Sequence, residues 1–216
     1  MPAADAAVSA EQTSRDKILD AAEALFAKRG YAAIGLRELA EVVGLGKSSL
    51  FHHFRNKAQL YAAVTARILV RIEARLVRSL AAGGDPLVRL ERWLDDLVDL
   101  LADNPTYARV LLRSLFEDDD LPGDLPEEIE GHRAIADMMA AVGGLLREGM
   151  GAGLFRPLHV NHFLLTLVGI IVFPFASGEF GAEVLGKDLF DAAEVRRRKR
   201  EIRALLRSGL VARASR

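Results

Sequence analysis

The sequence predicts an all-α protein of about nine helices. Apolar residues recur every three or four positions through most of the 216 residues, which is the period of an amphipathic helix. No segment alternates β-branched and polar residues between turn residues, as the strands of a hairpin would. Glycine and proline fall between the periodic segments, at Gly30, Gly44, Gly83-Gly84 and Pro122-Gly123, where helices are expected to end.

The N-terminal segment is expected to hold three helices, over Ser14–Lys28, Leu36–Val43 and Lys47–His53. Gly44 follows the second helix and can adopt the left-handed conformation that commonly ends a helix. Residues 1–12 are rich in alanine and lack the basic start and apolar core of a signal peptide. A disordered arm is therefore expected there.

The rest of the chain is expected to form longer helices. The first of them, Lys57–Leu80, has an apolar residue at every fourth position. The others are expected over Pro86–Asp103, Pro105–Phe116, Glu127–Met150, Leu158–Ser177 and Asp188–Ser208. The run Phe163–Phe175 is apolar but too short to cross a bilayer core of about 30 Å, so we expect a buried helix and no membrane contact.

Charge is distributed unevenly along a chain whose net charge is −1. Residues 28–78 carry ten basic and three acidic side chains, whereas residues 79–130 carry four basic and 14 acidic ones. A second basic segment, residues 195–216, has nine basic side chains and one acidic. A concentrated basic segment is typical of a surface that binds phosphate, so residues 28–78 are the expected nucleic-acid contact.

The composition argues against several kinds of chemistry. The chain has no cysteine, which excludes disulfides, zinc–thiolate sites and thiol catalysis and fits a cytoplasmic protein. It has no Gly-x-Ser-x-Gly elbow, no P-loop and no His-Glu-x-x-His motif. We therefore expect no enzyme activity, no cofactor and no metal.

The segment from Gly44 to Leu60 is the most informative part of the chain. It predicts a short helix that follows a glycine turn and presents a lysine, two serines, an aromatic residue and two histidines. A helix-turn-helix needs such a second helix to place polar and cationic side chains in a DNA groove. The unpaired N–H groups at the start of that helix also favour phosphate.

Residues 13–61 resemble the DNA-binding domain of the TetR (tetracycline-repressor) family of bacterial regulators. The matching residues are Ile18–Ala27 with Gly30-Tyr31, Arg37–Ala40, Gly44, Lys47, Leu50–Lys57 and Leu60. The resemblance implies a homodimeric repressor that a small-molecule effector releases from a near-palindromic operator in double-stranded DNA. It also implies that residues 62–216 form a helical bundle for effector binding and for dimerisation through the last two helices.

The resemblance further implies which side chains contact DNA. They are Arg37, Lys47, Ser48, Ser49, Phe51, His52, His53 and Lys57. Lys57 would hold a phosphate, and Lys47 and the serines would face base edges or phosphates. The chain departs from the family pattern where hydroxyl groups are usual: Ile34-Gly35 and Gly46 replace serine or threonine, and Phe51 replaces a tyrosine. We therefore expect fewer phosphate contacts.

An effector pocket is implied by the resemblance alone. The large side chains expected around it are Trp93, Tyr107, Phe116, Met138, Met139, Phe155 and Phe163, and each of them equally suits a plain core. His159 and His162 are open to an ordinary polar role or to a ligand. Adjacent histidines on a helix, such as His52 and His53, point about 100° apart and cannot share one ion well.

Two questions stay open at the level of the sequence. The run Arg196–Arg200 suits either a second nucleic-acid contact or the flank of a helix that pairs with the acidic middle region or a partner subunit. The alternative to a regulator is a helical small-molecule-binding protein or enzyme whose helix-turn-helix is vestigial, and an adaptor that works only through protein contacts is a third possibility.

Overall fold

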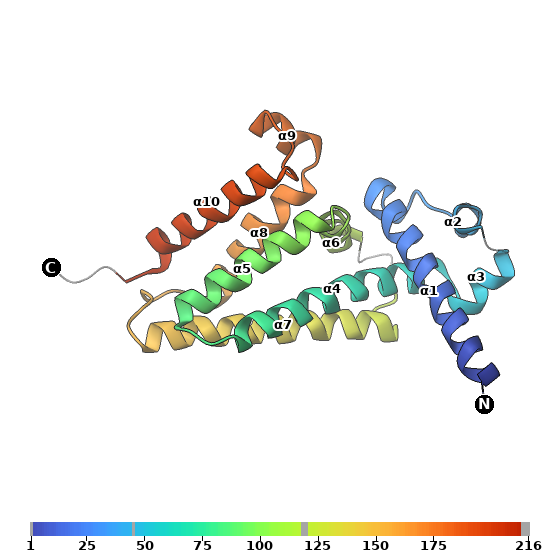
Figure 1. Ribbon diagram of the computed structural model, residues 1–216, viewed down its shortest axis with the longest axis horizontal. Helices are drawn as coiled ribbons and strands as arrows, with labels where there is room; N and C mark the ends of the chain where they lie inside the picture. The colour runs from blue at the N-terminus through green and yellow to red at the C-terminus, as the bar shows by residue number, and fades with distance from the viewer. Residues whose placement is uncertain (1, 45, 118–120, 213–216) are drawn as a thin grey trace. The chain divides into compact units, whose positions relative to one another are not determined.

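The computed structural model describes residues 2–44, 46–117 and 121–212, and over these residues it is all-α with ten helices (Figure 1). The helices are α1 Pro2–Arg29, α2 Leu36–Val43, α3 Lys47–His53, α4 Lys57–Ala81, α5 Pro86–Asp103, α6 Tyr107–Glu117, α7 Pro126–Gly151, α8 Val160–Ala176, α9 Glu179–Leu185 and α10 Ala192–Leu210. The predicted fold class is confirmed. The acidic run Asp118–Asp120 lies outside the described residues.

The chain divides into two compact units. The first comprises Met1–Ile68 and Arg109–Gly131, and the second comprises Leu69–Ala108 and His132–Arg216. Helices α4, α6 and α7 therefore each contribute residues to both units.

In the first unit, α1 begins at Pro2, where the sequence suggested a disordered arm through residue 12 and a helix from Ser14. The expectation was wrong about this start. Five of residues 2–12 are alanine, which has the highest helix propensity, and no glycine interrupts them. Proline is tolerated in the first turn of a helix because a backbone N–H at that position has no acceptor within the helix.

Aromatic rings fill the centre of the first unit. Phe26 of α1 and Tyr61 of α4 are almost fully buried, and their rings meet edge to face with centroids 4.9 Å apart. Tyr31, in the loop after α1, packs against the same Tyr61 at 5.1 Å. Arg67 on α4 also pairs with Asp20 and Glu23 of α1, at 2.8 and 2.7 Å. Within this unit, both apolar and charged contacts therefore hold α1 against α4.

Helices α2 and α3 have the bounds that the sequence predicted. Gly44 ends α2 with φ of 69°, in the left-handed region that favours glycine, and its N–H bonds to the Ala40 and Glu41 carbonyls. Helix α4 begins with a reciprocal cap: the Gln59 N–H donates to Asn56 Oδ1 at 2.8 Å, and Gln59 Oε1 accepts from the Arg55 N–H at 2.9 Å. These caps fix where α2 ends and where α4 begins.

In the second unit, α5 contacts both α8 and α10 (Figure 1). Asp85 caps α5 by accepting from the Leu87 and Val88 N–H groups at 2.9 and 3.0 Å. The inward face of α5 is apolar: Leu90, Leu94, Leu97, Val98 and Leu101 are buried. These side chains contribute to the apolar core of the second unit.

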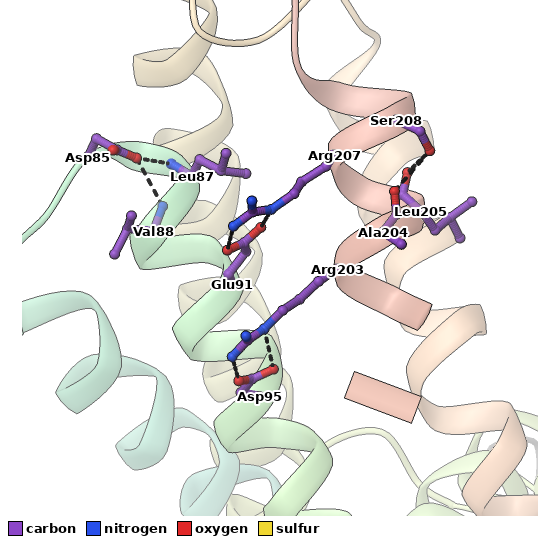
Figure 2. A network of polar contacts seen from close by, with 10 residues as sticks. All are labelled: Asp85, Leu87, Val88, Glu91, Asp95, Arg203, Ala204, Leu205, Arg207 and Ser208. Carbon is purple, nitrogen blue, oxygen red and sulfur yellow. Dashed lines mark hydrogen bonds and ion pairs between the residues drawn. The ribbon is translucent and has the colours of Figure 1, made fainter. Parts of the chain in front are cut away.

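The contact between α5 and α10 includes a ladder of three ion pairs, two of which Figure 2 shows. Arg207 donates two hydrogen bonds to Glu91, at 2.6 and 2.8 Å, Arg203 pairs with Asp95, and Lys199 pairs with Asp99. Acidic residues four positions apart on α5 meet basic residues four positions apart on α10, so one face of each helix carries the ladder. The sequence left open whether Arg196–Arg200 contacts nucleic acid or pairs with the acidic middle region. For Lys199, the ion pair with Asp99 confirms pairing with the acidic middle region.

Helix α8 contains Pro174, which removes one hydrogen bond from the helix. The carbonyl of Ile170 would normally accept from the N–H of residue 174, and proline has none. Arg198 of α10 donates to this carbonyl instead. Burial lowers the pKa of Arg198, as expected when a guanidinium is withdrawn from water.

The expectation that α8 would be buried is only half right. Leu164, Leu167, Ile171 and Phe175 are buried, but Leu165 is 72% exposed and Phe173 is 51% exposed. The helix is largely apolar all round, and the rest of the chain covers only one of its faces. Over the described residues, no single helix has both the length and the apolar character to cross a bilayer; α8 and α9 reach that composition only together, across a bend of 94°.

Helix α9 was not predicted. It is short, it lies between Gly178 and Gly186, and Gly186 ends it in the left-handed conformation with φ of 64°. The sequence places Gly181 inside it as well, which lowers the helical propensity of the segment. Leu205 of α10 is exposed.

Candidate nucleic-acid interface

The outward face of α3 is set by the two residues that anchor the helix. Leu50 and Phe54 are buried, on one side of the helix. Ser48, Phe51 and His52, at spacings of three and four, lie on the opposite side and are exposed. Of the predicted DNA-contacting residues, the structure brings these three to one face. The side chain of Lys47 lies outside the described residues.

Helix α2 presents Arg37 to solvent. Its neighbour Glu38 pairs with Arg29 at the end of α1, and Arg29 also donates to the Ala33 carbonyl at 2.8 Å. The loop before α2 is therefore held by side-chain contacts, which orients α2 even though Gly35 at its start provides no side-chain cap. No local pattern in the sequence predicts the Arg29–Glu38 pair.

Lys57 has a contact within the protein that the sequence did not suggest. Its Nζ donates to the Tyr31 carbonyl at 2.9 Å and lies 4.0 Å from the centroid of the Tyr31 ring. The side chain is half-buried. An ammonium group has three donors, so two remain for a phosphate, but Lys57 also ties α4 to the loop between α1 and α2. No sequence signal connects residues 26 positions apart in this way.

The histidines of α3 diverge. Their ring centroids are 5.5 Å apart with planes at 69°; His52 is exposed and His53 is half-buried. Ser49 is also half-buried, which turns it partly away from the outward face. His159 and His162, at the start of α8, form a separate exposed pair with centroids 4.7 Å apart. In the described parts of the chain, no group of three or more metal-ligating side chains comes together.

The predicted pocket residues fall into different environments. In the second unit, Trp93, Tyr107, Met138 and Phe155 are buried, while Met139 and Phe163 are half-buried. Phe116 belongs to the first unit and is 79% exposed. It lies in the last turn of α6, just before the acidic segment.

Two of these aromatic residues have defined structural partners. The Tyr107 hydroxyl accepts a hydrogen bond from Arg71 of α4. The Phe155 ring lies against Gly149 of α7, in the space that a side chain at residue 149 would occupy. Trp93 is different, because its buried Nε1 has no hydrogen-bond partner among the described residues. A buried donor without an acceptor is costly, so Trp93 is the residue of the set that a ligand would best complement.

Known proteins match this chain most clearly over the helix-turn-helix. Residues 18–64 match the family model of bacterial regulatory proteins, tetR family. Over 117 residues the chain is 31% identical to the HTH-type transcriptional repressor KstR of Mycolicibacterium smegmatis. The aligned region covers 54% of this chain and 57% of the relative. The chain spans about half the length of the curated relatives that it matches.

Solved structures are similar over nearly the whole fold. A bacterial regulatory protein in the tetR family from Rhodococcus RHA1 has a TM-score of 0.76 at 19% identity, over 93% of this chain and 98% of that one. AibR, in complex with isovaleryl coenzyme A and operator DNA, has a TM-score of 0.72 at 17% identity, over 89% and 97% of the two chains. At these identities the likeness concerns the fold.

The fold and the α2–α3 surface define a helix-turn-helix protein with a second, helical unit. Over residues 18–64, the chain is similar to the DNA-binding region of bacterial regulatory proteins of the tetR family.

Proposed function

We propose that this protein is a dimeric, sequence-specific transcriptional repressor that leaves its operator when a small-molecule effector binds. The observation that carries the proposal is the outward face of α3, where Ser48, Phe51 and His52 are exposed while Leu50 and Phe54 hold the helix in place. This face belongs to the segment with ten basic and three acidic side chains. Such a surface suits the major groove of DNA, in the cytoplasm of a bacterial cell.

Dimerisation would bring two such surfaces to one operator. The exposed apolar residues of α8, Leu165, Val168 and Phe173, lie on one face of that helix, and Leu205 of α10 is exposed as well. An exposed apolar face of this kind is typical of a protein interface. A second copy of the chain is the partner we propose, with the two α3 helices about 34–36 Å apart in successive major grooves.

The second unit would hold the effector. It contains the buried Trp93, whose Nε1 lacks a partner, and it shares α4 with the DNA-binding unit. An effector that binds one arrangement of the dimer better than the other would shift the population between them, by no more than its difference in affinity. The coenzyme A thioester in the AibR complex shows the kind of ligand bound by that protein, and no particular effector is assigned to this one.

The test is selection of bound duplexes from a random DNA pool with the purified full chain at near-physiological salt. An enriched inverted repeat is the expected result. Salt-sensitive binding with no enriched sequence would contradict sequence-specific regulation and leave a non-specific basic surface. Binding of small molecules with no binding of DNA at all would favour the alternative, a carrier or enzyme with a vestigial helix-turn-helix.

The effector half of the proposal needs a separate measurement. Candidate ligands are added to the complex of the protein with its selected duplex, and release is followed by fluorescence anisotropy. Trp93 fluorescence reports binding in the absence of DNA, since Trp93 is the chain's only tryptophan. A ligand that binds but does not release the duplex would contradict effector-controlled repression by that ligand.

A further inference from the structure

We propose that Phe51 reads the 5-methyl group of a thymine in each operator half-site. This inference rests on the proposed function and assigns a role in base discrimination to one residue of the α3 surface. It starts from an anomaly of that surface: a fully apolar ring stands 38% exposed between polar and basic neighbours.

The position of Phe51 is fixed from both sides. Leu50 precedes it and Phe54 follows three residues later, and these two anchors are 0% and 1% exposed. Ser48 lies one turn before Phe51 on the same outward face, and His52 lies beside it. The ring therefore projects from a helix whose orientation is determined by core packing, and it has only two side-chain torsions to settle.

The chemistry of the ring limits what it can recognise. Phenylalanine has no donor or acceptor, so it cannot bond to a phosphate as a tyrosine hydroxyl can. Among the four bases, only thymine presents a methyl group in the major groove, and apolar side chains contact it there. Against any other base edge, the ring would cover polar groups without satisfying them. A thymine methyl is therefore the complementary partner.

The basic side chains of residues 28–78 have a role different from the one proposed for Phe51. Arg37 and Arg55 are exposed in the same basic segment, and their charge attracts the phosphate backbone regardless of sequence. Phe51 adds nothing to that attraction. Its contribution depends on whether a methyl group is present at one position, which makes it a determinant of specificity.

The size of the effect follows from the burial of a single carbon. Removing one methyl group from water is worth about as much as burying a CH₂ group, so one contact changes affinity by roughly fourfold. A dimer makes the contact twice. Loss of both methyl groups should therefore weaken operator binding by about 15-fold, if the two half-sites contribute independently.

The experiment removes the methyl group from the DNA. Each thymine of the selected operator is replaced in turn, symmetrically in both half-sites, by deoxyuridine, which pairs identically and lacks only the methyl. Affinities of the wild-type full chain, Phe51→Ala and Phe51→Tyr are measured by fluorescence anisotropy at one fixed salt concentration. Val77→Ala, which shortens an exposed apolar side chain of the second unit, is the control variant.

At one thymine position, deoxyuridine should weaken binding by wild type and by Val77→Ala about 15-fold. Phe51→Ala should bind the unmodified operator less tightly and lose the sensitivity at that position, while Phe51→Tyr, which keeps the ring, should retain it. Since no charge is removed, the salt dependence of Phe51→Ala should match that of wild type.

Three results would overturn the assignment. If no thymine position is sensitive to the methyl group, or if the half-site contains no thymine, Phe51 reads no methyl although the protein remains a sequence-specific regulator. If the same position stays sensitive in Phe51→Ala, another side chain reads that methyl. If the selection enriches no sequence, the proposed function itself fails, and methyl recognition fails with it.

Discussion

At residue 149, the absence of a side chain decides how the chain leaves α7. The Phe155 ring occupies the space beside the Gly149 backbone, and a Cβ added there would lie 2.1 Å from the Phe155 Cδ2 atom. The Gly149 carbonyl also accepts from the Leu154 and Phe155 N–H groups, at 2.9 and 3.0 Å. The reversal of the chain after α7 thus depends on contact between backbone and ring.

Gly149→Ala should therefore lower the free energy of unfolding by about 1–3 kcal/mol, because the ring must move out of a packed position. Gly144→Ala, in the same helix, is the matched control. Nothing lies within 4 Å of a Cβ at residue 144, so alanine should stabilise the helix there by up to about 1 kcal/mol. Urea denaturation followed by circular dichroism measures both, and equal stability of the two variants would contradict this account.

Lys57 shows that a residue's position in the sequence can predict one of its contacts and miss another. Its position at the start of α4 indicated a phosphate contact, and that contact remains a prediction. The ammonium group is also bound to the Tyr31 carbonyl and lies over the Tyr31 ring. These contacts depend on how α1 and α4 pack, which local sequence patterns do not encode.

Lys57→Met keeps most of the aliphatic stem and removes the charge. We expect a loss of about 1–2 kcal/mol in the free energy of unfolding, from the hydrogen bond and the cation–π contact together. If Lys57 also holds a phosphate, the slope of log affinity for the selected operator against log salt concentration should become shallower by about one. Unchanged stability would refute the structural role, and an unchanged slope would refute the phosphate contact.

At the scale of elements, predictions succeeded where local chemistry marks both ends of a helix. The bounds of α2 and α3 were predicted to the residue because Gly44 stops the first and Gly46 precedes the second. Helix α9 was missed because its seven residues contain a glycine and lack a side-chain cap. The exposed face of α8 could not be predicted, since a helix that is apolar all round gives no signal of which side is covered.

The bond from Arg198 to the Ile170 carbonyl leads to a prediction about α8. Arg198→Met should cost about 0.5–1.5 kcal/mol of stability, because it leaves the carbonyl without a donor. In a Pro174→Ala background, the new N–H of residue 174 can bond to Ile170, so the same change should cost less. A double-mutant cycle of unfolding free energies measures this coupling. Equal costs in both backgrounds would show that Arg198 does not replace the missing N–H.

In the ladder of ion pairs between α5 and α10, the two side chains of the Glu91–Arg207 pair differ in exposure. The side chain of Glu91 is 9% exposed, whereas that of its partner Arg207 is 60% exposed. Hydrogen bonding to Glu91 and its charge raise the pKa of Arg207, so the arginine keeps its charge at all ordinary pH values. Removing the arginine would leave a buried carboxylate unpaired, while removing the carboxylate's charge would leave an arginine that water can solvate.

Arg207→Met should therefore destabilise the protein more than Glu91→Gln, although both changes break the same pair. The free energy of unfolding should fall further for Arg207→Met than for Glu91→Gln, because only the first change leaves a buried charge unpaired. Chemical denaturation of the two variants in parallel gives the comparison. The opposite order would mean that the pair is dominated by the packing of the glutamate rather than by its charge.

For the whole molecule, the unpaired apolar face of α8 is the strongest indication that one chain is not the functional unit. Leu165→Glu would place a charge on this face, and burying it in an apolar interface is costly. Sedimentation equilibrium should therefore show a dimer for wild type and a monomer for Leu165→Glu. Leu115→Glu, the same substitution at an exposed leucine of α6, should remain dimeric.

The loss of the dimer should carry through to DNA. A monomer has one α3 helix, so it should bind the inverted repeat with the affinity of a single half-site and gain nothing when the second half-site is added. Wild type should lose affinity steeply when one half-site is scrambled, and Leu165→Glu should lose only about twofold, the statistical effect of one site in place of two. A monomeric Leu165→Glu that still distinguishes one half-site from two would show that DNA itself assembles the pair through another surface. A variant that remains dimeric would exclude the α8 face as the interface.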